Sequence, residues 1–261
     1  MAYETILVSD VEGVRTITLN RPKELNAADH RLTRELRKAL KETARDKTVR
    51  CLVLAAAGRA FCAGQDLKEA TAGEEPFDFS RRLREGYNPV ILQLQSLAVP
   101  TLASINGVAA GAGWSLALAC DLRIASSRAR FVSAFSSIGL IPDSGMTWTL
   151  PRLVGYARAL EITWSSDAIS AETALQWGLI HRMVEPDALC DATAQWALRL
   201  ARGPTRGYAL AKRALIAGLG ADLETQLEYE AVLQGIAGQT RDYEKGVSAF
   251  IHKRQPEFTG E

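Results

Sequence analysis

A buried strand, a second short strand and a helix recur along the first two-thirds of this 261-residue chain, and this repeat limits the folds open to it. The clearest strands are CLVLAAA (51–57) and TLASI (101–105). Both are apolar without alternation, which is typical of strands covered on both faces. The units follow one another roughly every 45–50 residues, as read from the hydrophobic pattern. The repeat predicts an α/β fold.

The other elements follow from periodicity and turn signals. TILVS (5–9) and VRTITL (14–19) predict a hairpin, and 29–46 predicts an amphipathic surface helix. A helix over 78–97 should break or kink at Pro89. We expect strands over 122–127 and 130–134, helices over 111–120, 157–164, 170–177, 187–202, 204–219 and 221–237, and a polar, mobile connection over 69–77.

Composition excludes several classes of protein. The chain is 47% apolar and 23% charged with a net charge of +1, so no global field attracts nucleic acid or an anionic membrane. The four cysteines and three histidines do not cluster, so we expect reduced, mostly buried thiols and no metal site. The first residues show no signal-peptide pattern, and 107–120 is too short to span a bilayer. We therefore expect a cytoplasmic protein with no membrane or nucleic-acid partner.

Two glycine-containing turns are candidate site elements. RAFCAGQDL (59–67) and NGVAAGAGWSLALACD (106–121) each follow a buried strand, and the second opens a helix. Glycines allow the backbone to approach a ligand, and a helix N-terminus offers unpaired N–H groups. Two such turns could direct two N–H donors at one oxygen, as an oxyanion hole. The alternative is tight packing of helix on sheet. Neither a dinucleotide fingerprint nor a phosphate loop is present.

Asp143 is the only acid in GLIPDSGMTWTLPRLVG (139–155). A carboxylate in apolar surroundings is costly unless it is paired, solvated or used. Because PDSG also suits a turn or a helix N-cap, a structural role is the alternative to a catalytic one.

Several segments together resemble the enoyl-CoA hydratase/isomerase (crotonase) family. They are NRPKELNA, FCAGQDL, INGVAAGAGWSLALACDLRIAS, FSSIGLIPDSGMTWTLPRLVG, ALQWGLIHRMV and RDYEKGVSAFIHKR, and they cover nearly the whole chain. The resemblance implies a crotonase-like spiral of ββα units with a C-terminal helical trimerisation module. It places the acyl-CoA site in residues 1–200 and oligomerisation in 201–261, giving a homotrimer or homohexamer.

The resemblance also implies site residues. The backbone N–H groups of Gln65 and Ala112 match the family's oxyanion hole. Contacts with the acyl-CoA are expected at Lys23, Glu24, Leu25, Ala27, Ala63, Gly64, Asp66, Leu67, Gly111, Phe135, Ile138 and Leu140. No cofactor or metal is implied, because CoA is part of the substrate.

The chain departs from the family's hydratases at two positions. Those relatives carry two glutamates where this chain has Ser115 and Phe135. Hydration needs a base for water and an acid for the α-carbon, so an isomerase with Asp143 as its single acid/base is favoured. The resemblance is strongest to members of phenylacetate catabolism that convert a ring 1,2-epoxyphenylacetyl-CoA to an oxepin-CoA. A Δ3–Δ2 enoyl-CoA shift is also open.

Two other functions stay open. One is a hydratase or lyase of the fatty-acid β-oxidation type, and the other a non-catalytic acyl-CoA-binding or RNA-binding member. Structural roles are expected for Asp66, which should fix its loop, for Asp121 and for Ser115 in helix packing. RRLRE (81–85) is expected to be a solvated helix face.

Overall fold

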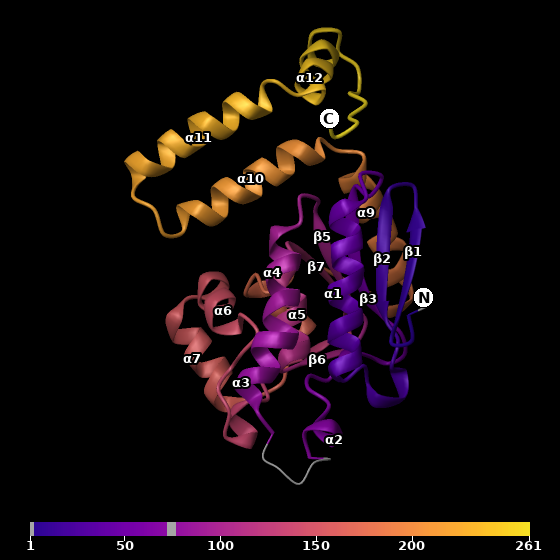
Figure 1. Cartoon of the computed structure of the whole chain (residues 1–261), viewed down its shortest axis with the longest axis vertical. Helices are drawn as coiled ribbons and strands as arrows, with labels where there is room; N and C mark the ends of the chain where they lie inside the picture. The colour runs from indigo at the N-terminus through magenta and orange to yellow at the C-terminus, as the bar shows by residue number, and fades with distance from the viewer. Residues whose placement is uncertain (1–2, 72–76) are drawn as a thin grey trace.

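The computed structural model describes residues 3–71 and 77–261 (Figure 1). Most of the polar connection expected over 69–77 lies outside the described residues, since it contains 72–76.

A six-stranded sheet forms the centre of the molecule. Its order is β1 (Ile6–Val11), β2 (Val14–Leu19), β3 (Cys51–Ala56), β5 (Thr101–Ile105), β7 (Leu122–Ser126) and β10 (Arg182–Val184). The β1–β2 hairpin is antiparallel and the other pairs are parallel. Every residue of β5 is buried, as its unbroken apolar run predicts. β10 was not predicted.

Three-residue strands build most of a second sheet. β4 (Ala60–Cys62), β6 (Val108–Ala110) and β8 (Arg130–Val132) run parallel, and β9 (Ile169–Ser170) pairs antiparallel with β8. The chain passes from β3 to β4, from β5 to β6 and from β7 to β8, so each repeat contributes one strand to each sheet. This winding is the spiral of ββα units that the sequence predicts.

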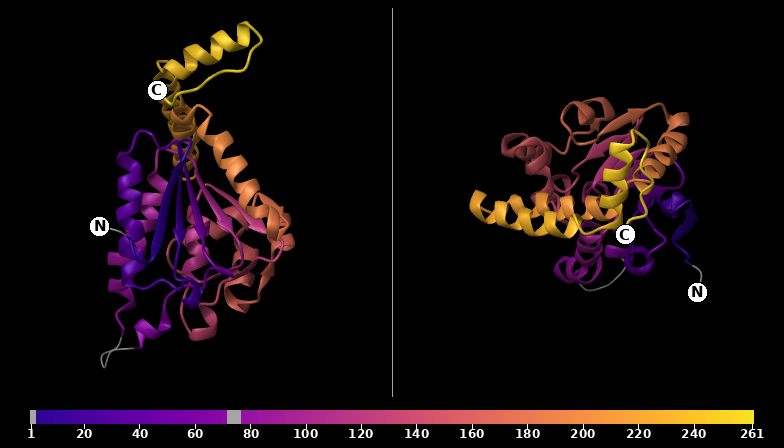
Figure 2. Two further views of the ribbon diagram at one scale, coloured as in Figure 1. Left: turned by 90° about the vertical axis from the view of Figure 1, so that its right-hand side faces the viewer. Right: turned by 90° about the horizontal axis from the view of Figure 1, so that it is seen from above.

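Helices cover both faces of the large sheet (Figure 2). Leu52 and Leu54 of β3 join the core beneath α1 (His30–Arg45), whereas Cys51 and Val53 pack against α9 (Leu189–Ala201). Because successive side chains of a strand point to opposite faces, β3 contributes to a hydrophobic cluster on each side of the sheet.

Seven further α-helices lie between residues 67 and 176 of the described chain. They are α2 (Leu67–Ala70), α3 (Phe79–Arg82), α4 (Asn88–Ser96), α5 (Ala112–Ala119), α6 (Met146–Val154), α7 (Tyr156–Ser165) and α8 (Ala171–Gln176). All eight residues of α5 are buried. The chain stays helical through Pro89. The irregularity expected there appears one turn earlier, as a π-helical turn over Leu83–Tyr87.

Three C-terminal helices stand apart from the sheets (Figure 1): α10 (Thr205–Gly218), α11 (Leu223–Ala237) and α12 (Arg241–Ile251). Lys212 of α10 pairs with Asp121 at 2.8 Å, and Asp121 also accepts hydrogen bonds from the Thr101 N–H and hydroxyl. Asp121 is therefore structural, as expected. No helix in the described part of the chain is long and apolar enough to cross a membrane. The cysteines are unpaired, and three of the four are buried.

Candidate active site

A cavity of about 240 Å³ lies between the two glycine turns, the α3–α4 segment and residues 134–143. Ten of the fifteen residues predicted for the site line it: Ala63, Gly64, Gln65, Leu67, Gly111, Ala112, Phe135, Ile138, Leu140 and Asp143. Its other lining residues are Phe79, Arg82, Leu83, Tyr87, Ala134 and Ser137, which sequence reasoning missed. Asp143 is the only carboxylate among these described residues.

The two turns approach each other closely enough to require glycine. Gly64 has φ +96°, and a Cβ there would lie 3.0 Å from the Ala110 carbonyl oxygen and 3.7 Å from the Ala112 nitrogen. A Cβ on Gly113 would lie 2.6 Å from Cys62 Cβ. The glycines therefore bring the end of β4 against the first turn of α5.

The close approach leaves two backbone donors beside the cavity. Gln65 faces Ala28 in a parallel bridge whose hydrogen bonds use Gly64 O, at 2.7 Å, and Asp66 N, at 3.2 Å. The Gln65 N–H therefore points away from Ala28. Ala112 begins α5, so its N–H has no intrahelical acceptor. Among residues 3–71 and 77–261, no hydrogen-bond acceptor meets either N–H.

Asp143 precedes α6 but does not cap it. Gly145 occupies the N-cap position and makes no side-chain cap, so the N-cap alternative is wrong. A turn is present, closed by the Met146 N–H and the Asp143 carbonyl at 3.0 Å, but it uses only the backbone of Asp143. The carboxylate accepts one hydrogen bond, from the Ser144 hydroxyl at 2.8 Å. Burial raises the pKa of the Asp143 carboxyl above its ordinary value, and the Ser144 bond lowers it only in part.

Ser115 and Phe135 stand at the two positions where the resemblance implies glutamates in hydratases. Ser115 is 1% exposed on α5, as its predicted packing role requires, and its hydroxyl donates to the Asp143 carbonyl at 3.0 Å. Phe135 is buried and contributes an apolar ring to the cavity wall. Asp143 therefore stands in the cavity without a second described carboxylate.

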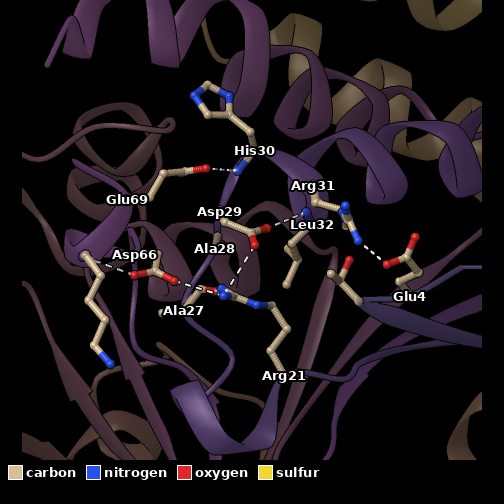
Figure 3. Close-up of polar contacts among 12 residues, drawn as sticks. Glu4, Arg21, Ala27, Ala28, Asp29, His30, Arg31, Leu32, Asp66 and Glu69 are labelled. Atoms are coloured by element: carbon tan, nitrogen blue, oxygen red, sulfur yellow. Dashed lines mark hydrogen bonds and ion pairs between the residues drawn. The ribbon is translucent and has the colours of Figure 1, made fainter. Parts of the chain in front are cut away.

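Asp66 does not line the cavity, and Figure 3 shows the polar contacts of its carboxylate. Its carboxylate caps α2 by accepting the Lys68 N–H at 3.1 Å and pairs with Arg21 at 2.9 Å. Arg21 also pairs with Asp29, the N-cap of α1, at 3.3 Å. Asp66 thus fixes its loop, as the sequence predicts.

The remaining four predicted contacts lie between residues 22 and 28. Lys23 and Glu24 line a separate, open hollow of about 810 Å³. The Leu25 carbonyl accepts the Ala63 N–H at 3.0 Å, and the Ala27 carbonyl accepts a hydrogen bond from Arg21 (Figure 3). The carbonyl of Leu25 is therefore used to hold the turn after β4, and the carbonyl of Ala27 is used to hold Arg21.

The expectation of a solvated face over 81–85 is wrong for two residues, Arg82 and Leu83, and Leu83 is half-buried and lines the cavity. Arg81, Arg84 and Glu85 are exposed, but Arg82 is 3% exposed and lines the cavity. Gly86 leaves room for its guanidinium, because a Cβ there would overlap Arg82. The spacing of Phe79, Leu83 and Tyr87, four residues apart, was the available sign of an inward face.

The chain is similar to known proteins of one family. Residues 10–261 match the enoyl-CoA hydratase/isomerase family model. The chain is 45% identical over 260 residues to 1,2-epoxyphenylacetyl-CoA isomerase of Escherichia coli (strain K12), covering 98% of this chain and 99% of that protein. It is 46% identical over 263 residues to a Rhodobacter capsulatus protein named "Probable enoyl-CoA hydratase", covering all of both.

A solved structure gives the same result for the fold. The crystal structure of enoyl-CoA hydratase from Bacillus anthracis matches with a TM-score of 0.93 at 33% identity, covering 99% of this chain and 100% of that chain. The chain therefore belongs to the enoyl-CoA hydratase/isomerase family, whose substrates are acyl-CoA thioesters. The predicted crotonase-like fold is confirmed.

Proposed function

We propose that this protein is an acyl-CoA isomerase that converts ring 1,2-epoxyphenylacetyl-CoA to an oxepin-CoA and shifts Δ3 double bonds of enoyl-CoA to Δ2. The observation that carries the proposal is the single carboxylate, Asp143, in an apolar cavity beside two free backbone N–H groups. The name of the Escherichia coli relative supports the ring substrate. An apolar cavity of about 150 Å³ holds benzene, so 240 Å³ has room for a six- or seven-membered ring.

One proton transfer serves both reactions. The Asp143 carboxylate removes a proton from the α-carbon, and the C–H electron pair moves toward the thioester oxygen to form an enolate. The N–H groups of Gln65 and Ala112 stabilise the negative charge on that oxygen. Asp143 then returns the proton to the γ-carbon, which leaves a double bond between the α- and β-carbons. No atom is gained or lost.

The ring substrate adds only a bond rearrangement. The carbon–carbon bond shared by the epoxide and the six-membered ring breaks, and the epoxide oxygen enters a seven-membered oxepin. The α-proton then moves to the ring carbon in the γ position by the step described above. Every group that these chemical steps require comes from Asp143, the two backbone donors or the substrate, of which CoA is a part.

We further assign the CoA portion to the surface around Lys23, Glu24, Leu25, Ala27 and Asp66. The open hollow beside them is lined by four cations, Arg21, Lys23, Arg31 and Arg34, and by four carboxylates, Glu4, Glu24, Asp29 and Glu69. Arg21 pairs with Asp29 and Arg31 with Glu4, whereas no ion pair within the described residues engages Lys23 or Arg34, which suit phosphate groups. Lys23→Ala should raise KM while kcat is kept, and an unchanged KM would remove Lys23 from this assignment.

The experiment that tests the function compares two substrates in deuterated water. Purified protein and Asp143→Asn are each incubated with a 3-enoyl-CoA and with crotonyl-CoA. We expect rapid conversion of the 3-enoyl-CoA, little hydration of crotonyl-CoA, and loss of conversion in the variant. The ring epoxide thioester is then tested in the same way.

Fast hydration of crotonyl-CoA that survives Asp143→Asn would establish the hydratase alternative, which the name of the Rhodobacter capsulatus relative favours. Silence on all three thioesters would contradict the isomerase and favour a non-catalytic member of the family.

A further inference from the structure

The Gln65 side chain is held at both ends, although only its backbone N–H has a part in the proposed reaction. Its Oε1 accepts hydrogen bonds from Arg82 Nε at 3.0 Å and from the Tyr87 hydroxyl at 2.9 Å. Its Nε2 donates to the Asp66 carbonyl and to Glu69 Oε2, each at 3.2 Å. A side chain with these four partners has a fixed conformation, and it restricts the peptide group to which it is attached.

Arg82 also holds the opposite side of the Gln65 bridge, where the Tyr87 hydroxyl lies 3.3 Å from the Ala28 carbonyl oxygen. Its Nη2 donates to the Ala28 carbonyl at 3.3 Å, the same oxygen that accepts the Asp66 N–H. Its Nη1 donates to Thr33 Oγ1 at 2.8 Å, and its guanidinium carbon lies 4.6 Å from the Tyr87 ring centre. The buried guanidinium therefore joins α1, the backbone at Ala28 and the turn that carries Gln65.

The segment that carries Arg82 also forms a wall of the cavity. Phe79, Leu83 and Tyr87 line the cavity from α3 and the π-helical turn. An acyl group that packs against this wall therefore contacts the segment whose Arg82 and Tyr87 bind the Gln65 side chain.

We propose that Arg82 is a positioning residue that directs the Gln65 N–H at the thioester oxygen, acting through the Gln65 side chain. This inference rests on the proposed function in assigning that N–H to the oxyanion. Loss of one oxyanion donor lowers kcat by about 10²–10³-fold. A donor that is present but points in the wrong direction still stabilises the oxyanion in part. Arg82→Met should therefore lower kcat by about 10–100-fold, with a smaller change in KM.

The test reads carbonyl polarisation directly. A 4-(dimethylamino)cinnamoyl-CoA absorbs further to the red when its thioester oxygen accepts hydrogen bonds. The probe is titrated with the wild type, Arg82→Met, Gln65→Met, the double variant and Arg81→Met. Arg81 is a matched control, because it lies next to Arg82 but is exposed, and its one ion pair within the described residues is with Glu85, at 3.1 Å.

We expect each single variant to lose at least half of the red shift while the dissociation constant of the probe changes only a few-fold. The double variant should lose no more than the larger single loss, because both changes break one connection. Arg81→Met should keep the full shift. Gln65→Met preserves the backbone N–H and the side-chain length, so it tests the proposal even if Arg82→Met does not fold.

Full red shift in folded Gln65→Met, or losses that add in the double variant, would overturn the positioning role. Wild-type protein that shifts the probe but isomerises no thioester would instead contradict the proposed function and leave the positioning role intact.

Discussion

The hydroxyl of Ser115 donates to the main-chain carbonyl of Asp143 across 3.0 Å, between α5 and the segment before α6. An ionised glutamate at position 115 could not make this bond, because a carboxylate only accepts. Ser115 therefore anchors the main chain of the segment that carries the Asp143 carboxylate. We predict that Ser115→Ala lowers kcat about fivefold, from the loss of roughly 1 kcal/mol of positioning. Unchanged kcat for the 3-enoyl-CoA would show that the bond does not orient Asp143.

Asp143→Asn should abolish activity without lowering the free energy of unfolding. Loss of a general base lowers rates by about 10²–10⁴-fold. The folded-state pKa of Asp143 is raised, so its contribution to stability is full below the unfolded value of 3.8 and is lost as pH rises through the folded value. At neutral pH the variant should therefore unfold at a urea concentration equal to or above that of the wild type. A clearly lower midpoint would mean that the carboxylate is structural.

The pH profile should report the same carboxyl. Since the base must be ionised, kcat/KM should rise with pH through a limb that lies above 3.8. The Ser144 hydroxyl stabilises the ionised form, so its removal should move this limb to higher pH. Ser144→Gly is the suitable variant, because Ser144 has φ +52° and glycine adopts this conformation without strain. A limb that stays in place, or moves to lower pH, would contradict the assignment.

Gly113→Ala should damage both stability and the oxyanion site. Its Cβ would overlap Cys62, so α5 must move and carry the Ala112 N–H with it. We expect a loss of about 1–3 kcal/mol in the free energy of unfolding and a fall in kcat. Gly207→Ala is the control, since a Cβ there meets only Pro204 at 3.9 Å. Equal urea midpoints for the two variants would argue against tight packing at Gly113.

The C-terminal helices should associate with other copies of the chain, and we propose residues 201–261 as the oligomerisation region. Leu215, Leu223 and Phe250 are 74%, 74% and 86% exposed on α10, α11 and α12. Such apolar side chains are stabilised by a partner surface. Sedimentation velocity should show a trimer or hexamer, and Phe250→Glu should shift it to smaller species. A monomer at micromolar concentration would contradict the proposal.

Sequence reasoning succeeded where local pattern and fold agree. The amphipathic period of α1 and the apolar run of β5 each reflect burial that continues over several residues. It failed for β4, β6 and β10, since three residues show no period, and it found the equally short β8 only within a longer predicted stretch, 130–134. It also misjudged Arg82, whose surroundings include Gln65, seventeen residues away, and Thr33, forty-nine residues away. A charged run does not reveal that distant segments will enclose one of its members.

The two oxygen-binding groups of the proposed reaction belong to the main chain, and this limits what side-chain mutagenesis can detect. Position 112 is already alanine, and an alanine at position 65 would keep the amide hydrogen. An alanine scan would therefore leave both donors in place and would report on them only through residues that direct them, such as Arg82 and the Gln65 side chain. The residues that a scan can detect are those that shape the turns, such as the glycines at 64 and 113. The groups that stabilise the oxyanion in the proposed reaction are backbone amides, which no side-chain substitution removes.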